Sequence, residues 1–176
     1  MARTTWHPVS KLFHWLMAIA IIYQWWLGWR AEELPFSPQK LDLFISHKSI
    51  GILLFLLVLL RLAFRFRLGV PPHTTTVTKI EQRAADAGHW ILYALMIAVP
   101  VSGWVVSDTS RIPFRLFKRY DVPDLMAADK AISDLAADVH GVLTTAFAVV
   151  LVIHVLAALR HHFLIKNNTL KRMLPW

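Results

Sequence analysis

The chain has 176 residues, 56% of them hydrophobic, with a mean hydropathy of +0.48 and a formal net charge of +8. A soluble domain of this size is less apolar, so the composition predicts one membrane domain over residues 1–176, with room for about four spans and short loops. The absence of cysteine excludes disulfides, covalent haem attachment and cysteine-bound iron–sulfur clusters, and the bases lie beside apolar runs, which favours a lipid bilayer over nucleic acid as their partner.

Four apolar runs follow one another along the chain, each long enough to cross a bilayer core about 30 Å thick. The first ends in Trp25, Trp26 and Trp29 with no small-residue cleavage site after it, which is typical of a retained span and not of a signal peptide. Loops with prolines separate the runs, and the last loop, 107–138, is polar with a short helix expected near 124–137. The sequence predicts an all-α membrane protein, a four-transmembrane-helix bundle with spans at about 12–29, 41–64, 89–106 and 139–159.

Lysine and arginine are unevenly distributed over the predicted loops. If both termini are cytoplasmic, the inner segments carry 11 bases and the outer segments carry the other 8. The bases that directly flank the spans lie on the inner side, and cytoplasmic loops are enriched in Lys and Arg. The predicted topology is therefore N-in and C-in.

Two histidines, His140 and His154, stand in the last run, which is otherwise almost entirely Val, Leu, Ala, Ile and Phe. On an α-helix the 14 residues from one to the other rotate to within about 40° of four full turns and rise about 21 Å. Both rings therefore face the same way, near opposite sides of the bilayer. That spacing predicts two stacked haems. By depth, His14 of the first span pairs with His154 near the inner face, and His47 of the second span pairs with His140 near the outer face.

Each pair is expected to bind one b-type haem through two neutral imidazoles. A single histidine in a span is often a hydrogen-bonded core residue, but four at two matched depths favour ligation. An iron with two axial histidines has no open position, so it suits electron transfer and not the activation of O₂. His89 opens the third span near the inner face and is the rival ligand to His14; we expect it to contact a propionate, a water or a quinone.

The interval that separates His140 from His154 recurs on the partner helices. Gly28 lies 14 residues after His14, and a glycine at that position lets a flat macrocycle approach the backbone. Arg61 lies 14 residues after His47, and its guanidinium can pair with haem propionates. The alternatives are a glycine for helix packing and an arginine of the positive-inside pattern. His161 and His162, just past the inner ligand, are candidates to donate to a quinone carbonyl.

The segments FHWLMA, SHKSIGILLFLLVLLRLAFRF, GHWILYALMIAVPVSGW and HHFLIKNNTLKRMLPW, with the span of His140 and His154, resemble the bacterial cytochrome b561 family over nearly the whole chain. The resemblance implies a multi-pass inner-membrane cytochrome with two b haems, whose ligands fall on His14, His47, His140 and His154. In one branch of the family it also implies superoxide oxidase activity, in which superoxide is oxidised to O₂ on the periplasmic side and ubiquinone is reduced.

The expected function is electron transfer from a periplasmic one-electron donor, superoxide in that branch, to ubiquinone. A positive potential from Lys48, Arg111 or Arg115 would steer the anion to the outer face. One alternative is a membrane cytochrome b subunit that passes electrons between a peripheral dehydrogenase or hydrogenase and quinone, with the outer loop 107–138 as its docking surface. Another is a non-redox carrier of haem or ions with proton-relay histidines.

Overall fold

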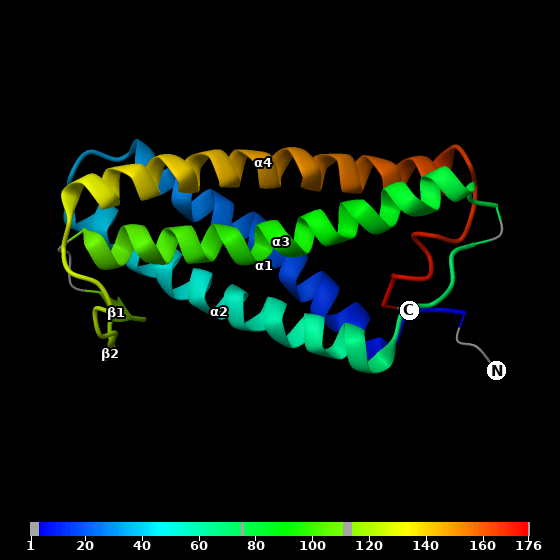
Figure 1. Cartoon of the computed structure of the whole chain (residues 1–176), viewed down its shortest axis with the longest axis horizontal. Coiled ribbons are helices and arrows are strands. Elements are labelled where there is room, and N and C mark those ends of the chain that lie inside the picture. The colour runs from blue at the N-terminus through cyan, green and yellow to red at the C-terminus, as the bar shows by residue number, and fades with distance from the viewer. Residues whose placement is uncertain (1–3, 75, 111–113, 176) are drawn as a thin grey trace.

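The structure is a computed structural model that describes residues 4–74, 76–110 and 114–175 as four long helices and one short hairpin (Figure 1). The helices are α1 (Pro8–Glu33), α2 (Pro38–Leu68), α3 (Lys79–Thr109) and α4 (Lys130–Phe163), and the antiparallel hairpin is β1 (Arg115–Leu116) with β2 (Tyr120–Asp121). The start of α1, the end of α4 and the α2–α3 connection lie at one end of the molecule, and the other two connections lie at the opposite end (Figure 1). The mostly helical fold is confirmed.

Each helix begins after a side chain that accepts hydrogen bonds from the free backbone N–H groups of the first turn. These capping residues are His7, Ser37, Thr78 and Asp129. In α1 and α2 a proline follows the cap, where its missing N–H has no cost. The caps stand outside the apolar runs, so every helix is longer than the span expected within it.

The connection between α3 and α4 differs from the expected short surface helix near 124–137. The carboxylate of Asp129 accepts from the N–H groups of Ala131 (2.8 Å) and Ile132 (3.1 Å), which starts α4 at Lys130. The expected surface helix is therefore mostly the first two turns of α4. The span histidines of α4 are carried on one uninterrupted helix, which fixes their relative direction.

Three helices, α2, α3 and α4, are long and apolar enough to cross a membrane. The fourth, α1, has 26 residues, which span about 39 Å, but Tyr23, Gln24 and the tryptophans beside them reduce the apolarity of its second half. Large apolar side chains on the bundle surface, such as Ile19 and Ile153, are 68% and 59% exposed. These surfaces suit lipid, and they support a multi-pass membrane protein.

The helices pack in two pairs, α1 with α2 and α3 with α4, and the pairs meet where α2 contacts α3. A small core of Met17, Val58 and Tyr93 lies at that junction. Among the described residues α1 and α4 make no close backbone approach, although histidines from the two helices face each other. The arrangement thus leaves the space between α1 and α4 to side chains and to any group that they hold.

Two buried polar residues attach the α3–α4 connection, predicted to be the outer loop, to the helix ends. The carboxylate of Asp108, which is 7% exposed, accepts from the backbone N–H groups of Leu125 (3.0 Å) and Met126 (2.6 Å). The hydroxyl of Ser49 on α2 accepts from the N–H of Phe117 at 2.8 Å. The hairpin is therefore held against α2, close to the position of Lys48.

Candidate functional site

The pair of histidines predicted for the outer side comes from α2 and α4, and the end of the bundle that holds it is here called the outer end and the opposite end the inner end. The ring centres of His47 and His140 lie 6.5 Å apart with an interplanar angle of 85°. The Nδ1 atom of His47 lies 3.1 Å from the carbonyl oxygen of Gln24, and that of His140 lies 3.0 Å from the carbonyl oxygen of Val99. A carbonyl only accepts, so each Nδ1 carries the proton and donates. Each Nε2 therefore keeps a free lone pair, as a metal-binding histidine requires.

Two glycines make room for these rings. A Cβ on Gly28 would lie 2.9 Å from Cε1 of His47, and a Cβ on Gly103 would lie 3.0 Å from Cε1 of His140. Gly28 thus lies against an imidazole ring, and the predicted approach of a macrocycle to this glycine stays a prediction. Gly103 was not predicted as a site residue, but it follows His89 by the same interval that singled out Gly28 after His14.

Three histidines meet at the inner end. The ring centres of His14 and His154 lie 6.3 Å apart at 62°, and those of His89 and His154 lie 5.5 Å apart at 66°. The structure thus brings together the predicted inner pair across α1 and α4, with the rival residue beside it. Ring distance alone leaves both pairings open.

Arg61 occupies the inner end with His14. Its guanidinium lies 3.3 Å from Nδ1 of His14, donates to the carbonyl oxygen of Ser10 at 3.1 Å and donates from Nε to the hydroxyl of Tyr93 at 3.2 Å. Arginine has no acceptor, so Nδ1 of His14 accepts here and the proton of its neutral ring is on Nε2; His14 would bind iron through Nε2 only with that proton moved to Nδ1 and the contact with Arg61 released. The inner and outer ends therefore differ: His47 and His140 donate to backbone carbonyls, whereas His14 receives a hydrogen bond from a cation.

The quinone candidates lie where the tail after α4 folds back. The side-chain oxygen of Asn167 accepts from the N–H of Thr169 at 3.0 Å, which directs its amide nitrogen to Nδ1 of His161, also at 3.0 Å. That nitrogen donates, so the proton of neutral His161 is on Nε2. His162 has a buried Nδ1 with no hydrogen-bond partner among the described residues. Both histidines thus retain unused hydrogen-bonding capacity.

The steering candidates at the outer end have different surroundings. The ammonium of Lys48 lies 5.7 Å from the ring centre of Phe114. Arg115 is exposed and paired with Asp121 at 2.6 Å, so much of its field is cancelled locally. Arg111 lies outside the described residues. Within the part of the chain that the structure describes, Lys48 forms no ion pair with a carboxylate.

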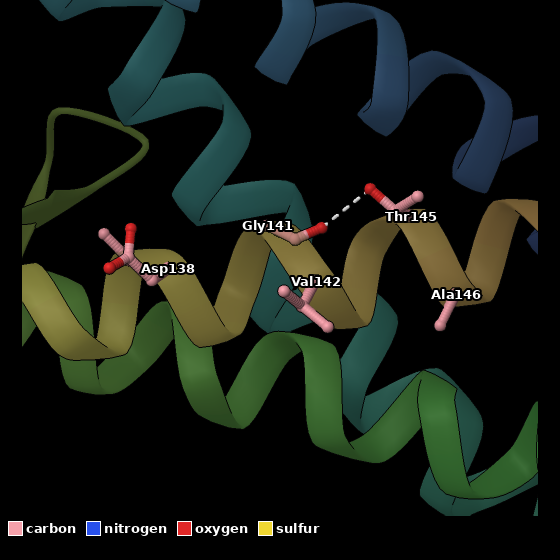
Figure 2. Close-up of a pocket in the computed structure, with 6 residues that line it drawn as sticks. Asp138, Gly141, Val142, Thr145 and Ala146 are labelled. Atoms are coloured by element: carbon pink, nitrogen blue, oxygen red, sulfur yellow. Dashed lines mark hydrogen bonds between the residues drawn. The ribbon is translucent and has the colours of Figure 1, made fainter.

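A shallow open groove of about 760 Å³ runs along one face of α4 (Figure 2). The lining residues are Ala137, Asp138, Gly141, Val142, Thr145 and Ala146. The hydroxyl of Thr145 donates to the carbonyl oxygen of Gly141 at 2.9 Å, within the helix itself (Figure 2). None of the predicted site residues lines this groove, so it is not part of the histidine sites.

Each histidine pair supplies two ligands, which is fewer than a bare metal ion takes. A bare ion takes three or more protein ligands, and the described residues contain no group of three His, Cys, Asp or Glu side chains arranged for one. Two imidazoles that bind one metal from opposite sides at about 2 Å each have ring centres about 6 Å apart. The distances of 6.3 and 6.5 Å agree with that value. The pairs thus fit an iron whose other four ligands come from a porphyrin.

Several supporting residues were not predicted, for a physical reason. The carbonyls of Gln24 and Val99 carry no sequence signal, because every residue has one and only helix register selects which is used. Tyr93 was not singled out because its contact with Arg61 joins positions 32 residues apart, and Asn167 because its contact with His161 forms only where the tail folds back after α4.

Comparison with known proteins gives a consistent result. A family model described as prokaryotic cytochrome b561 matches residues 5–176. "Cytochrome b561 homolog 2" of Escherichia coli (strain K12) is 35% identical over 167 residues, covering 94% of this chain and 89% of that protein. "Probable superoxide oxidase CybB" of Yersinia pestis is 31% identical over 168 residues, covering 92% and 91%. "Cytochrome b561 homolog 1" of E. coli is 27% identical, covering 92% of each chain.

Proposed function

The chain belongs to the prokaryotic cytochrome b561 family, and from that premise we propose that it is a superoxide:ubiquinone oxidoreductase with two b haems. Family membership makes it a multi-pass electron-transfer protein of the bacterial inner membrane. The observation that carries the proposal is the pair of histidine sites, whose ring centres lie 6.3 and 6.5 Å apart. Their α4 members, His140 and His154, are separated by about four helical turns.

The proposed haem ligands are His14 with His154 at the inner site and His47 with His140 at the outer site. A b-type haem held in this way supplies an iron that takes up and releases one electron without an open coordination position. At the outer site the carbonyls of Gln24 and Val99 fix the proton on Nδ1, which orients each ring. At the inner site Arg61 supplies positive charge, and ligation by His14 would require its ring proton to move from Nε2 to Nδ1, which releases the hydrogen bond from Arg61.

The proposed topology has four spans with both termini inside, so α1 is the fourth span. Its length of 26 residues is sufficient, and the terminal tryptophans Trp25, Trp26 and Trp29 suit the outer interface. Arg65, Arg67 and Arg160 at the opposite end suit the cytoplasmic side. This orientation puts His47 and Lys48 toward the periplasm.

We propose superoxide as the donor because the relative from Y. pestis is named a probable superoxide oxidase. Superoxide loses one electron and becomes O₂, with no bond made or broken. Two superoxide ions supply the two electrons that convert one ubiquinone, with two protons, to ubiquinol. Lys48 would attract the anion; Arg115 contributes less because Asp121 neutralises it.

The quinone is proposed to bind beside the tail at the inner end. With Nδ1 of His161 occupied by Asn167, Nε2–H is available to donate to a quinone carbonyl. His162 is the second donor. An imidazole can accept a proton on one ring nitrogen and release one from the other, so the same side chains can pass on the protons that quinone reduction consumes.

Stopped-flow mixing of the purified oxidised protein with superoxide tests this function. We expect rapid appearance of the reduced b-type band, followed by its loss when ubiquinone is added. Rapid reduction that superoxide dismutase abolishes supports the proposal. No reduction by superoxide, with normal reoxidation of dithionite-reduced protein by quinone, would instead support a cytochrome b subunit that serves a peripheral dehydrogenase or hydrogenase.

A further inference from the structure

The two helix pairs repeat one arrangement of residues at their outer ends. In α1–α2 the carbonyl of Gln24 meets His47 at 3.1 Å, and Gly28, one helical turn after Gln24, makes room for the ring. In α3–α4 the carbonyl of Val99 meets His140 at 3.0 Å, and Gly103, one helical turn after Val99, makes room for that ring. The outer site is therefore built from two equivalent halves.

The same register extends to the inner end of the bundle. His14 lies ten residues before Gln24, and His89 lies ten residues before Val99. A tryptophan directly follows each of these two histidines. Arg61 follows His47 by the same interval by which His154 follows His140. Arg61 thus holds the position in the first pair that a histidine ligand candidate holds in the second.

The contacts at the inner end follow this register. In α3–α4 the rings of His89 and His154 are 5.5 Å apart, and in α1–α2 the guanidinium of Arg61 is 3.3 Å from His14. Arg61 is half-buried, and its other partners, the Ser10 carbonyl and the Tyr93 hydroxyl, are neutral. Within the described residues no carboxylate forms an ion pair with it. Its charge is therefore not neutralised by any side chain in the described part of the protein.

We propose that Arg61 sets the direction of electron transfer by giving the inner site a higher affinity for an electron than the outer site. This inference rests on the proposed two-haem function. A fixed positive charge beside a redox group stabilises an added electron through space, without a hydrogen bond to a ligand, and an incompletely hydrated site screens that charge weakly. The outer site has neutral carbonyls against both of its histidines, and Lys48 turns toward Phe114. One electron leaves the outer group and the inner group gains it; no bond changes.

Potentiometric titration of the haem-loaded protein, followed by its visible spectrum, tests the inference. His140→Ala isolates the inner group and His154→Ala isolates the outer group, so the two midpoints can be assigned. In the otherwise unchanged protein we expect the inner midpoint to be the higher. Arg61→Gln should shift the electron distribution between the sites at least tenfold toward the outer one, which is about 59 mV for a one-electron couple.

Two controls accompany this variant. Arg61→Lys keeps the charge and should retain most of the difference, and Arg67→Gln removes an exposed base from the same helix and should leave both midpoints unchanged. An inner midpoint below the outer one in the unsubstituted protein would overturn the inference, and so would unchanged midpoints in Arg61→Gln. Loss of one haem from Arg61→Gln would also overturn it, because the residue would then retain the group. Absence of a b-type spectrum from the unsubstituted protein would instead overturn the proposed function.

Discussion

Gly103 of α3 lies so close to His140 of α4 that a Cβ at the glycine would stand 3.0 Å from Cε1 of the ring. Because of this contact the ring of His140 cannot move toward α3. The distance between α3 and α4 therefore constrains the orientation of the ring. The contact also keeps Nδ1 of His140 within 3.0 Å of the Val99 carbonyl. A one-carbon addition at position 103 is therefore a direct test of the outer site.

Gly103→Ala should lower the haem content of the outer site. The methyl group forces the ring or the helix to shift, and overpacking of this kind costs about 1–3 kcal/mol. The pyridine haemochrome assay gives haem per chain, and thermal unfolding gives the loss of stability. Gly28→Ala should behave similarly, because its Cβ would lie 2.9 Å from Cε1 of His47.

Gly141→Ala is the matched control for this substitution. Gly141 adjoins His140 in sequence and lies on an α-helix, but a Cβ there meets nothing within 4 Å. Its haem content should equal that of the unsubstituted protein. Equal haem loss from Gly103→Ala and Gly141→Ala would show that the close contact with the ring is not the cause.

Alanine substitution of single histidines should separate the inner pairing from its rival. We expect His154→Ala, His14→Ala and His140→Ala each to leave about one haem per chain, because a single remaining imidazole holds the group weakly. His89→Ala should keep two. Haem per chain and the low-temperature α-band measure this. Retention of two haems in His14→Ala together with loss in His89→Ala would reassign the inner ligand to His89.

The sequence predicted the histidine pairs because helical periodicity relates residues a whole number of turns apart without knowledge of the fold. His14 with His154 and His47 with His140 are close in space, as that periodicity and matched depth indicated. The sequence favoured His14 over His89 as the inner ligand, and this stays a prediction, because the structure places both rings near His154 from different helices. That choice depends on how α1 and α3 rotate about their axes, which only packing determines.

The supporting contacts were beyond sequence reasoning for a related reason. The expected pairing of Arg61 with a propionate stays a prediction, whereas its contacts within the protein, with His14, Ser10 and Tyr93, were not predicted. These residues are 47, 51 and 32 positions away in the chain. No local pattern relates them, because three helices must pack before they meet.

Asp108→Ala should destabilise the outer loop and leave the histidine sites intact. The buried carboxylate accepts from the N–H groups of Leu125 and Met126, and its loss leaves both donors without a partner, at about 1–3 kcal/mol. Limited proteolysis between residues 114 and 129 should become faster. Asp124→Ala, an exposed residue of the same loop, is the control and should change stability by less than about 0.5 kcal/mol. Equal protection of the loop in both variants would contradict the anchoring role.

Asn167→Ala tests whether the tail prepares His161 for quinone. Asn167 is 8% exposed, and its amide both donates to Nδ1 of His161 and accepts from the N–H of Thr169. Without it, the proton of His161 can move to Nδ1 and the ring can turn. Loss of one such hydrogen bond costs about 0.5–1.5 kcal/mol, so reoxidation of the reduced haems by ubiquinone should slow by about two- to tenfold.

The readouts for this variant separate a quinone defect from a folding defect. Haem content and reduction by superoxide should stay unchanged, because His161 lies about two helical turns beyond His154 on the same helix. Asn168→Ala is the matched control, since that neighbouring side chain is exposed. If His161 is the donor, Asn167→Ala should raise the ubiquinone KM or slow reoxidation while Asn168→Ala does neither. An unchanged reoxidation rate in both variants would leave His162, whose Nδ1 is buried without a partner among the described residues, as the donor to test.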